Sequence, residues 1–175
     1  QRLICNVCQI PGDKIRSGQL ERYEWGQLDS KIVALENAPL YVDDTPQLSV
    51  FELRSKARRM VREHGVKMIF IDYLQLMHSD DKKKSDNRVQ EISEITRSLK
   101  ILAKEFNVPV ILLSQLSRSV EQRTDGNKTP RLSDLRDSGS IEQDADMVIF
   151  LSRPAYYDKE SDQQNICEVI IEKNR

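Results

Sequence analysis

The stretch MIFIDYLQ, residues Met68–Gln75, decides the fold of this chain. Apolar residues fill every position up to Asp72, without the alternation of a strand that has one wet face. Such a run predicts a short parallel strand that is covered by helices on both sides. Ligands of parallel sheets bind beyond the carboxyl ends of the strands, so Asp72 is a candidate metal ligand. The alternative is a carboxylate that only completes a turn.

Three further apolar runs follow the same pattern. Val110–Leu113 is again continuous and stops at Ser114 and Gln115, and two more runs cover Met147–Leu151 and Ile166–Ile171. Strands that alternate with helices of more than about ten residues are typical of a mostly parallel α/β sheet. We therefore expect Gln115 at the same edge of the sheet as Asp72.

Helices are predicted on either side of these strands. Ser49 and Glu52 have the spacing of a capping box, and Gly65 is a suitable helix end. The apolar spacing predicts a helix from Ser49 to this glycine. The same helical periodicity predicts helices over residues 19–37 and 89–106.

Two features leave alternatives open. Arg54, Arg58 and Arg62 share one helix face, which either contacts phosphates or is a solvated surface. Cys5 and Cys8 have the spacing of half a zinc site, but the chain holds no second pair of this kind, which favours buried structural thiols.

Composition bounds the class of protein. Of 175 residues, 38% are hydrophobic and 31% are charged, which is typical of a soluble globular domain. The net charge of −1 gives no global attraction to nucleic acid, so binding of that kind would depend on local patches. The apolar runs are too short to cross a membrane, and three cysteines with no sign of secretion predict a cytoplasmic location. Both ends of the chain, Gln1 and Arg175, look cut.

Three strings together resemble one family. Phe70–Met77, Ser114–Arg123 and Asp137–Asp146 closely resemble DnaB-type replicative DNA helicases, in the same order and at similar intervals. The resemblance implies a RecA-like motor domain from a ring-shaped homo-hexamer that moves along single-stranded DNA. It also implies ATP and Mg²⁺ as cofactors, primase and a helicase loader as partners within the primosome, and no membrane association.

The resemblance assigns roles to particular residues. Asp72 matches the Walker B residue that organises magnesium, and Gln115 matches a polar sensor of the γ-phosphate that reports to the DNA loop. Arg136, Asp137 and Gly139 match the loop that holds the DNA backbone in the central channel. Here the arginine supplies charge, and backbone N–H groups near the glycine approach a phosphate.

The last residues of the chain match a second catalytic element of the family. Lys173 and Arg175 resemble the basic pair that reaches into the nucleotide site of the next subunit as an arginine finger. Without the resemblance, the same residues would be interpreted as a frayed, charged terminus.

The chain departs from the family in one respect. Its sequence contains no Gly-x-x-x-x-Gly-Lys-[Ser/Thr] phosphate loop, which the family carries upstream together with a catalytic acidic residue and a helical collar. We therefore expect residues 1–175 to be a partial RecA-like domain, incomplete at its N-terminal side, with an exposed gap in its sheet. We also expect that it neither binds ATP tightly nor hydrolyses it. The alternatives are a RecA-type recombinase and an inactive module that binds DNA or protein.

Overall fold

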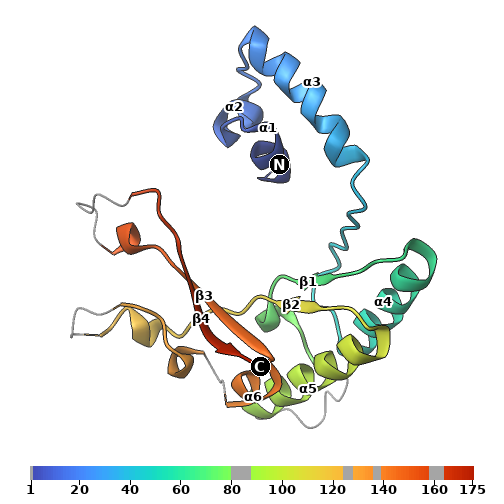
Figure 1. The fold of residues 1–175 in the computed structure, drawn as a ribbon, viewed down its shortest axis with the longest axis vertical. Helices are drawn as coiled ribbons and strands as arrows, with labels where there is room; N and C mark the ends of the chain where they lie inside the picture. Colours follow the sequence, from blue (N-terminus) through green and yellow to red (C-terminus); the bar gives the residue numbers. More distant parts are fainter. Residues whose placement is uncertain (1, 80–87, 124–127, 136–138, 158–163) are drawn as a thin grey trace. The chain divides into compact units, whose positions relative to one another are not determined.

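The computed structural model describes residues 2–79, 88–123, 128–135, 139–157 and 164–175 (Figure 1). The chain divides into two compact units, Gln1–Asp44 and Thr45–Arg175, which are described separately.

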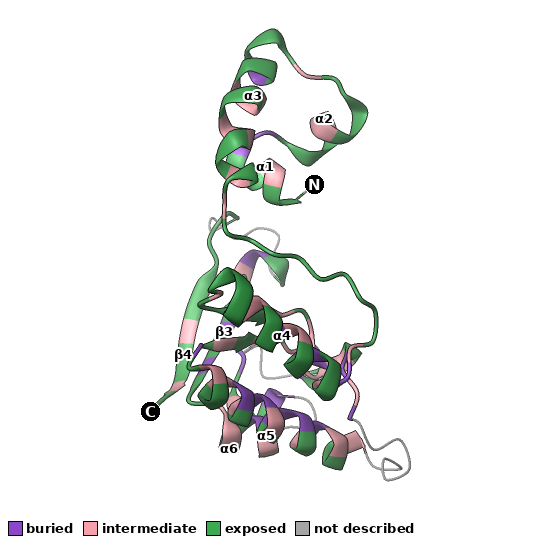
Figure 2. Ribbon diagram, turned by 90° about the vertical axis from the view of Figure 1, so that its right-hand side faces the viewer, coloured by how far each residue is buried: buried purple, intermediate pink, exposed green. Residues whose placement is uncertain are grey.

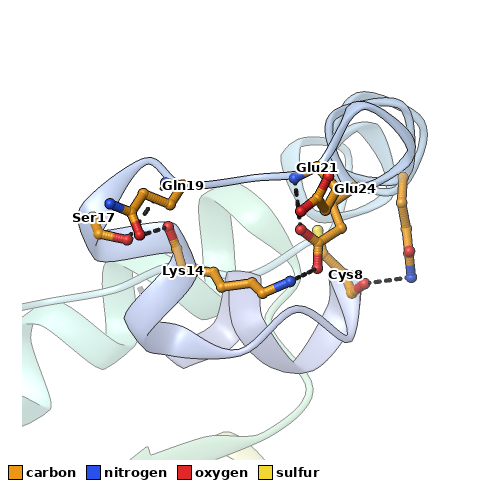
Figure 3. A network of polar contacts seen from close by, with 7 residues as sticks. Cys8, Lys14, Ser17, Gln19, Glu21 and Glu24 are labelled. Carbon is orange, nitrogen blue, oxygen red and sulfur yellow. Dashed lines mark hydrogen bonds and ion pairs between the residues drawn. The ribbon is translucent and has the colours of Figure 1, made fainter.

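The first unit consists of short helices joined by tight turns. Its helices are α1 (Arg2–Cys8), α2 (Gly12–Ser17) and α3 (Arg22–Glu36). Figure 3 shows the polar network that ties them together. Lys14 donates to Glu24 at 2.7 Å, and Glu24 also accepts from the backbone N–H of Glu21 at 2.8 Å. The bond from Lys14, followed by the bond from Glu21, holds the pKa of the Glu24 carboxyl below its usual value.

The helix that we predicted over residues 19–37 is three residues shorter at its start than the apolar pattern suggests. A capping box between Glu21 and Glu24 begins α3 at Arg22. Tyr23 and Trp25, which belong to that apolar pattern, are exposed in the structure. Cys8 is buried at the end of α1, and its carbonyl oxygen accepts from Gln27 at 2.8 Å.

The second unit begins with α4 (Val50–His64), whose ends are those that the sequence predicts. The Ser49 hydroxyl accepts from the N–H of Glu52 at 3.2 Å, and the Glu52 carboxylate accepts from the N–H of Ser49 at 3.0 Å. This reciprocal box satisfies two backbone donors that the first turn would leave without partners. At the other end, Gly65 adopts a left-handed conformation with φ of 64°, which costs glycine nothing.

A parallel strand pair forms the centre of this unit. β1 (Ile69–Ile71) pairs with β2 (Val110–Leu112), with Ile69 opposite Val110 and Ile71 opposite Leu112. The crossover between them contains α5 (Arg88–Phe106), as a parallel connection requires.

The core lies between this strand pair and the helices α4 and α5, which are on the same side of the strands in Figure 1. Leu74, directly after β1, is fully buried, as are Ile92 and Ile95 on α5. Buried positions recur along α5 at helical spacing (Figure 2). Residues of α5 that the periodicity predicts to be apolar therefore form the main packing surface.

One prediction about the central strands is wrong. We expected β1 to be covered on both faces, but Phe70 is 66% exposed and Ile111, opposite it on β2, is also exposed. The flanking residues Ile69 and Ile71 pack against the core cluster instead. Adjacent residues of a strand point to opposite faces, so the exposed side chains define a single uncovered face of the sheet.

The remaining strands, β3 (Met147–Ser152) and β4 (Glu168–Asn174), pair antiparallel. This detail differs from the mostly parallel arrangement that we expected. The connection between them, residues 153–167, joins strands that run in opposite directions, so it needs no crossover helix. The short helix α6 (Gly139–Asp144) precedes β3. The described helices include none with the length and apolar character of a membrane span.

Candidate nucleotide and DNA site

A hollow of about 300 Å³ lies at the carboxyl ends of β1 and β2. It is lined by Asp72 and Tyr73 from the first strand and by Leu113, Ser114 and Gln115 from the second. Asp72 and Gln115 are both exposed. The structure thus brings these two predicted site residues together at one edge of the sheet.

The strand register explains this arrangement. Ile71 lies opposite Leu112 at the last paired position, and the N–H of Leu113 donates to the carbonyl of Ile71 at 3.0 Å. Each chain leaves the sheet directly beyond this pair. The residues that follow the two strands therefore face the same crevice, which is where parallel sheets bind ligands.

Gln75 has no role assigned to it from the sequence, although it lies within the stretch that decides the fold. Its side-chain amide contacts both polar residues that follow β2: it donates to the Ser114 hydroxyl at 3.3 Å and accepts from the N–H of Gln115 at 3.4 Å. The sequence signal for a role at this edge of the sheet is its position three residues after Asp72. In the structure it lies on a 3₁₀ turn.

Backbone contacts connect Gln115 with the predicted DNA loop. Leu116 and Leu135 form an isolated antiparallel bridge, and the N–H of Ser117 donates to the carbonyl of Asp134 at 2.8 Å. The chain on the far side of this bridge continues directly into position 136. The predicted sensor, Gln115, therefore directly precedes one residue of this bridge, and the predicted DNA loop directly follows the other.

Two of the three predicted DNA-binding residues, Arg136 and Asp137, lie outside the described residues. The third, Gly139, is the exposed first residue of α6. A side chain added at this glycine would meet no atom within 4 Å, so the space around it is open. That openness is what close approach of a phosphate to the backbone requires.

A buried ion pair holds the segment between Gln115 and this loop. Arg123 donates through Nη2 to Asp134, whose side chain is 4% exposed, while the arginine side chain is 17% exposed. Asp134 also accepts from the N–H of Arg131 at 2.7 Å, and Arg123 donates to the carbonyl of Thr129 at 2.9 Å. No pattern in the sequence predicts this pair, because its members lie 11 positions apart in a polar region.

The predicted finger residues lie apart from the hollow, at the end of β4. The ammonium of Lys173 donates to the carbonyl of Glu142 and, at 3.5 Å, to that of Gln143, at the C-terminus of α6. The N–H of Arg175 donates to the carbonyl of Asp146 at 3.0 Å. A hydrogen bond from Lys100 holds the pKa of the Asp146 carboxyl below its usual value.

The basic face of α4 is partly engaged within the unit. Arg54 and Arg58 both form ion pairs with Glu105 of α5, at 2.7 and 2.8 Å. The bond from Arg58 is the main reason why the pKa of the Glu105 carboxyl is lowered. Arg62 lines a separate hollow of about 400 Å³ on the same helix. The ion pairs favour the alternative of a solvated surface for this face.

The residues around the β1–β2 hollow suit Mg²⁺ bound together with a nucleotide. Mg²⁺ prefers oxygen ligands and is usually held by one or two carboxylates, with phosphates and waters completing its coordination. Asp72 provides the carboxylate, and Ser114 and Gln115 add uncharged side-chain oxygens. Among the described residues there is no cluster of three or more His, Cys, Asp or Glu that would form a metal cage of protein ligands alone.

The chain matches the protein family described as DnaB-like helicase C terminal domain over residues 1–175. It is 53% identical over 174 residues to the replicative DNA helicase DnaB of Geobacillus stearothermophilus and 52% identical to the replicative DNA helicase DnaC of Bacillus subtilis (strain 168). Each alignment covers 99% of this chain and 38% of the relative. The chain thus spans well under half the length of these relatives.

Solved structures give the same result for the fold. One that is described as an ATPase domain superposes with a TM-score of 0.90 at 46% identity, over 99% of this chain and 61% of that one. A DnaB-like replicative helicase, solved in a study of its interactions with primase, gives 0.91 at 45% identity, over 99% and 42% of the two chains. These similarities confirm an incomplete RecA-like α/β fold.

Proposed function

Because the chain belongs to the family of DnaB-like helicase C-terminal domains, we propose that it is part of the ATP-driven motor of a hexameric replicative DNA helicase. The full-length protein would translocate on single-stranded DNA and unwind duplex at the replication fork. The similarity to replicative helicases over 99% of the chain favours this function over that of a RecA-type recombinase.

The observation that carries the proposal is the pairing of Asp72 with Gln115 in one hollow at the strand ends. Asp72 would hold Mg²⁺, which when bound neutralises charge on the nucleotide phosphates. Gln115 would contact the γ-phosphate from the neighbouring strand. An amide group can both donate to and accept from its surroundings, so it can respond to the presence of a phosphate oxygen.

A change in the conformation of Gln115 would reach the DNA loop through a short stretch of backbone. The bridge between Leu116 and Leu135 joins the strand end to the segment that enters the Arg136 loop. In the proposed hexamer, Arg136 would contact the DNA backbone by charge, while the backbone near Gly139 approaches a phosphate. Asp137, between them, belongs to the same loop. Contacts of this kind fix the position of the protein on DNA without reading sequence.

The finger residues would act on the neighbouring subunit. Lys173 and Arg175 lie outside the hollow of their own chain, which suits a role in the next nucleotide site. A cation supplied in this way stabilises charge on the transferring phosphoryl group and raises the rate by about 10³–10⁵. The site would therefore be complete only in the assembled ring.

We extend the proposal to partners and location. Primase and a helicase loader would contact the full-length protein, in the cytoplasm. Residues 1–175 alone, a partial domain of the motor, would neither bind ATP tightly nor hydrolyse it, because their sequence lacks the phosphate loop whose backbone cradles the phosphates. Calorimetric titration of this chain with Mg²⁺–ATP is expected to give no micromolar binding, and micromolar affinity would contradict this part.

The main test uses the full-length protein with forked duplex and with single-stranded DNA. We expect DNA-stimulated ATP hydrolysis, strand separation and ring-shaped hexamers. Filaments that coat DNA without separating strands would favour the recombinase alternative. Binding to DNA or protein without any hydrolysis would favour the inactive module.

The DNA loop has its own test, in which an Arg136→Ala change is compared with Arg59→Ala, on the exposed part of α4. The loop variant is expected to weaken binding of single strands equally for different sequences. It is also expected to reduce the dependence of affinity on salt, since one phosphate contact is lost per subunit. Binding equal to that of Arg59→Ala would contradict the loop assignment.

A further inference from the structure

We propose that Gln75 is a positioning residue of the motor: its side-chain amide fixes the backbone that carries Gln115 against the loop that carries Asp72. This inference rests on the proposed function and deepens it. It concerns a residue that touches neither nucleotide nor DNA in the proposed scheme. Gln75 acts through Gln115.

Backbone pairing between the two strands ends just before the site. The last contacts run from the N–H of Leu113 to the carbonyl of Ile71 at 3.0 Å and from the N–H of Leu74 to the carbonyl of Leu113 at 2.9 Å. Beyond Leu113 the second chain is no longer held by the backbone of the first. Among the described residues, backbone contacts resume only at the Leu116–Leu135 bridge, so without a further contact the intervening residues, Gln115 among them, would be free to change orientation toward the phosphate.

The Gln75 amide continues the connection by one step. Its Nε2 group donates to the Ser114 hydroxyl at 3.3 Å, and its Oε1 atom accepts from the N–H of Gln115 at 3.4 Å. One donor and one acceptor on the same planar group have the chemistry of a peptide unit. The side chain therefore replaces the backbone partner that the diverging strand no longer provides.

Gln75 is itself anchored from two directions. It occupies the 3₁₀ turn Leu74–Leu76, next to the fully buried side chain of Leu74. Its carbonyl oxygen accepts from Arg88 Nη2 at 3.3 Å, and Arg88 forms an ion pair with Glu91 at 2.5 Å, so the start of α5 holds the turn. An amide attached to this anchored turn can transmit a fixed position to Gln115.

The proposal predicts an effect on the coupling of DNA binding to ATP hydrolysis rather than on ATP binding. Substrate binding depends mainly on Asp72 and on groups outside this chain, whereas the response to DNA depends on the orientation of Gln115. Removing the Gln75 amide should therefore lower the stimulation factor, which we define as kcat with single-stranded DNA divided by kcat without it. The KM for ATP should change much less.

The test uses the full-length protein and a Gln75→Met change, which keeps the length of the side chain and removes both hydrogen bonds. We expect the stimulation factor to fall about 5-fold, the effect of losing two long hydrogen bonds at the weak end of the usual range, with the KM for ATP within about 2-fold of the unaltered protein. Gln90→Met, the same change at an exposed glutamine of α5, is the matched control and should leave both values unchanged.

A double-mutant cycle with Gln115→Ala identifies the route. Since the amide acts through Gln115, Gln75→Met should lower the factor by less than about 2-fold in the Gln115→Ala background. If Gln75→Met does not assemble into hexamers, Gln75→Asn, which keeps the amide but is one methylene too short to reach Ser114 and Gln115, is taken through the same cycle. The same lack of additivity is expected.

Two results would overturn the inference: an unchanged stimulation factor in the Gln75 variant, or an equal fall in both backgrounds. A lower melting temperature with an unchanged factor would mean that Gln75 is only a structural support, and it would overturn the inference too. Failure of the unaltered protein to show any DNA stimulation is a different outcome, since it would refute the proposed function itself.

Discussion

An Arg123→Ala change is expected to lower the free energy of unfolding by about 3 kcal/mol. Removing one member of a buried ion pair costs about 3–5 kcal/mol, because the other charge is left without compensation. In the variant, the carboxylate of Asp134 is left without its cation. This side chain is 4% exposed, and it still accepts a hydrogen bond from the N–H of Arg131 at 2.7 Å. That bond, and the partial exposure of the arginine at 17%, place the cost at the lower end of the range.

Urea unfolding followed by far-UV circular dichroism reports on the helices of both units, whereas Trp25 fluorescence reports on the first, so the change that circular dichroism shows without a matching change in fluorescence belongs to the second unit. Lys100→Ala is the control, because its partner Asp146 is largely exposed and such surface pairs contribute little. The double variant Arg123→Ala/Asp134→Ala should be more stable than the sum of the single changes predicts, by about 1–3 kcal/mol. Additive losses would refute the assignment of a coupled, buried pair.

Four other perturbations test the fold and the finger. Ser49→Ala removes the cap of α4 and should cost about 1 kcal/mol in urea unfolding, whereas an unchanged midpoint would argue against the capping box. Bonds from the backbone and then the side chain of Ser49 hold the pKa of the Glu52 carboxyl below its usual value. Its contribution to stability is therefore complete above the unfolded pKa of about 4.3 and is lost as pH falls through the lower folded pKa. A pH series of urea unfolding midpoints in unaltered and Glu52→Gln protein would detect this loss. Leu74→Ala, at a position with no exposure, should destabilise the second unit by about 2–5 kcal/mol, and a loss under 1 kcal/mol would contradict its place in the core. In the full-length protein, Arg175→Ala should reduce ATP hydrolysis by about 10³-fold or more, and mixed rings with Asp72→Asn subunits should regain part of the activity if the finger acts in trans.

Local chemistry explains what the sequence predicts well. The capping box at Ser49 and the left-handed Gly65 depend only on neighbouring residues, and the structure has α4 between them. The position of Asp72 beside Gln115 follows from two apolar runs that end in polar residues. Parallel strands deliver their ends to one edge, so this placement needs no knowledge of side-chain contacts.

Long-range contacts explain what the sequence does not predict. An apolar run such as Ile69–Ile71 has no alternation that would show which face stays open, and Phe70 is exposed although its neighbours are not. The antiparallel pairing of β3 with β4 depends on the path of the connection rather than on the strands. The bonds of Gln75 and the pair of Arg123 with Asp134 depend on segments that meet only in the folded chain.

The most direct test of a motor centred on the β1–β2 hollow is ATP hydrolysis by the full-length protein carrying Asp72→Asn, with Asp29→Asn on the exposed side of α3 as the matched control. The change preserves size and removes the charge that would hold Mg²⁺. We predict a loss of hydrolysis of about 10²-fold or more, with and without DNA, and no loss in the control. Hydrolysis by Asp72→Asn at the rate of the unaltered protein would contradict the central claim.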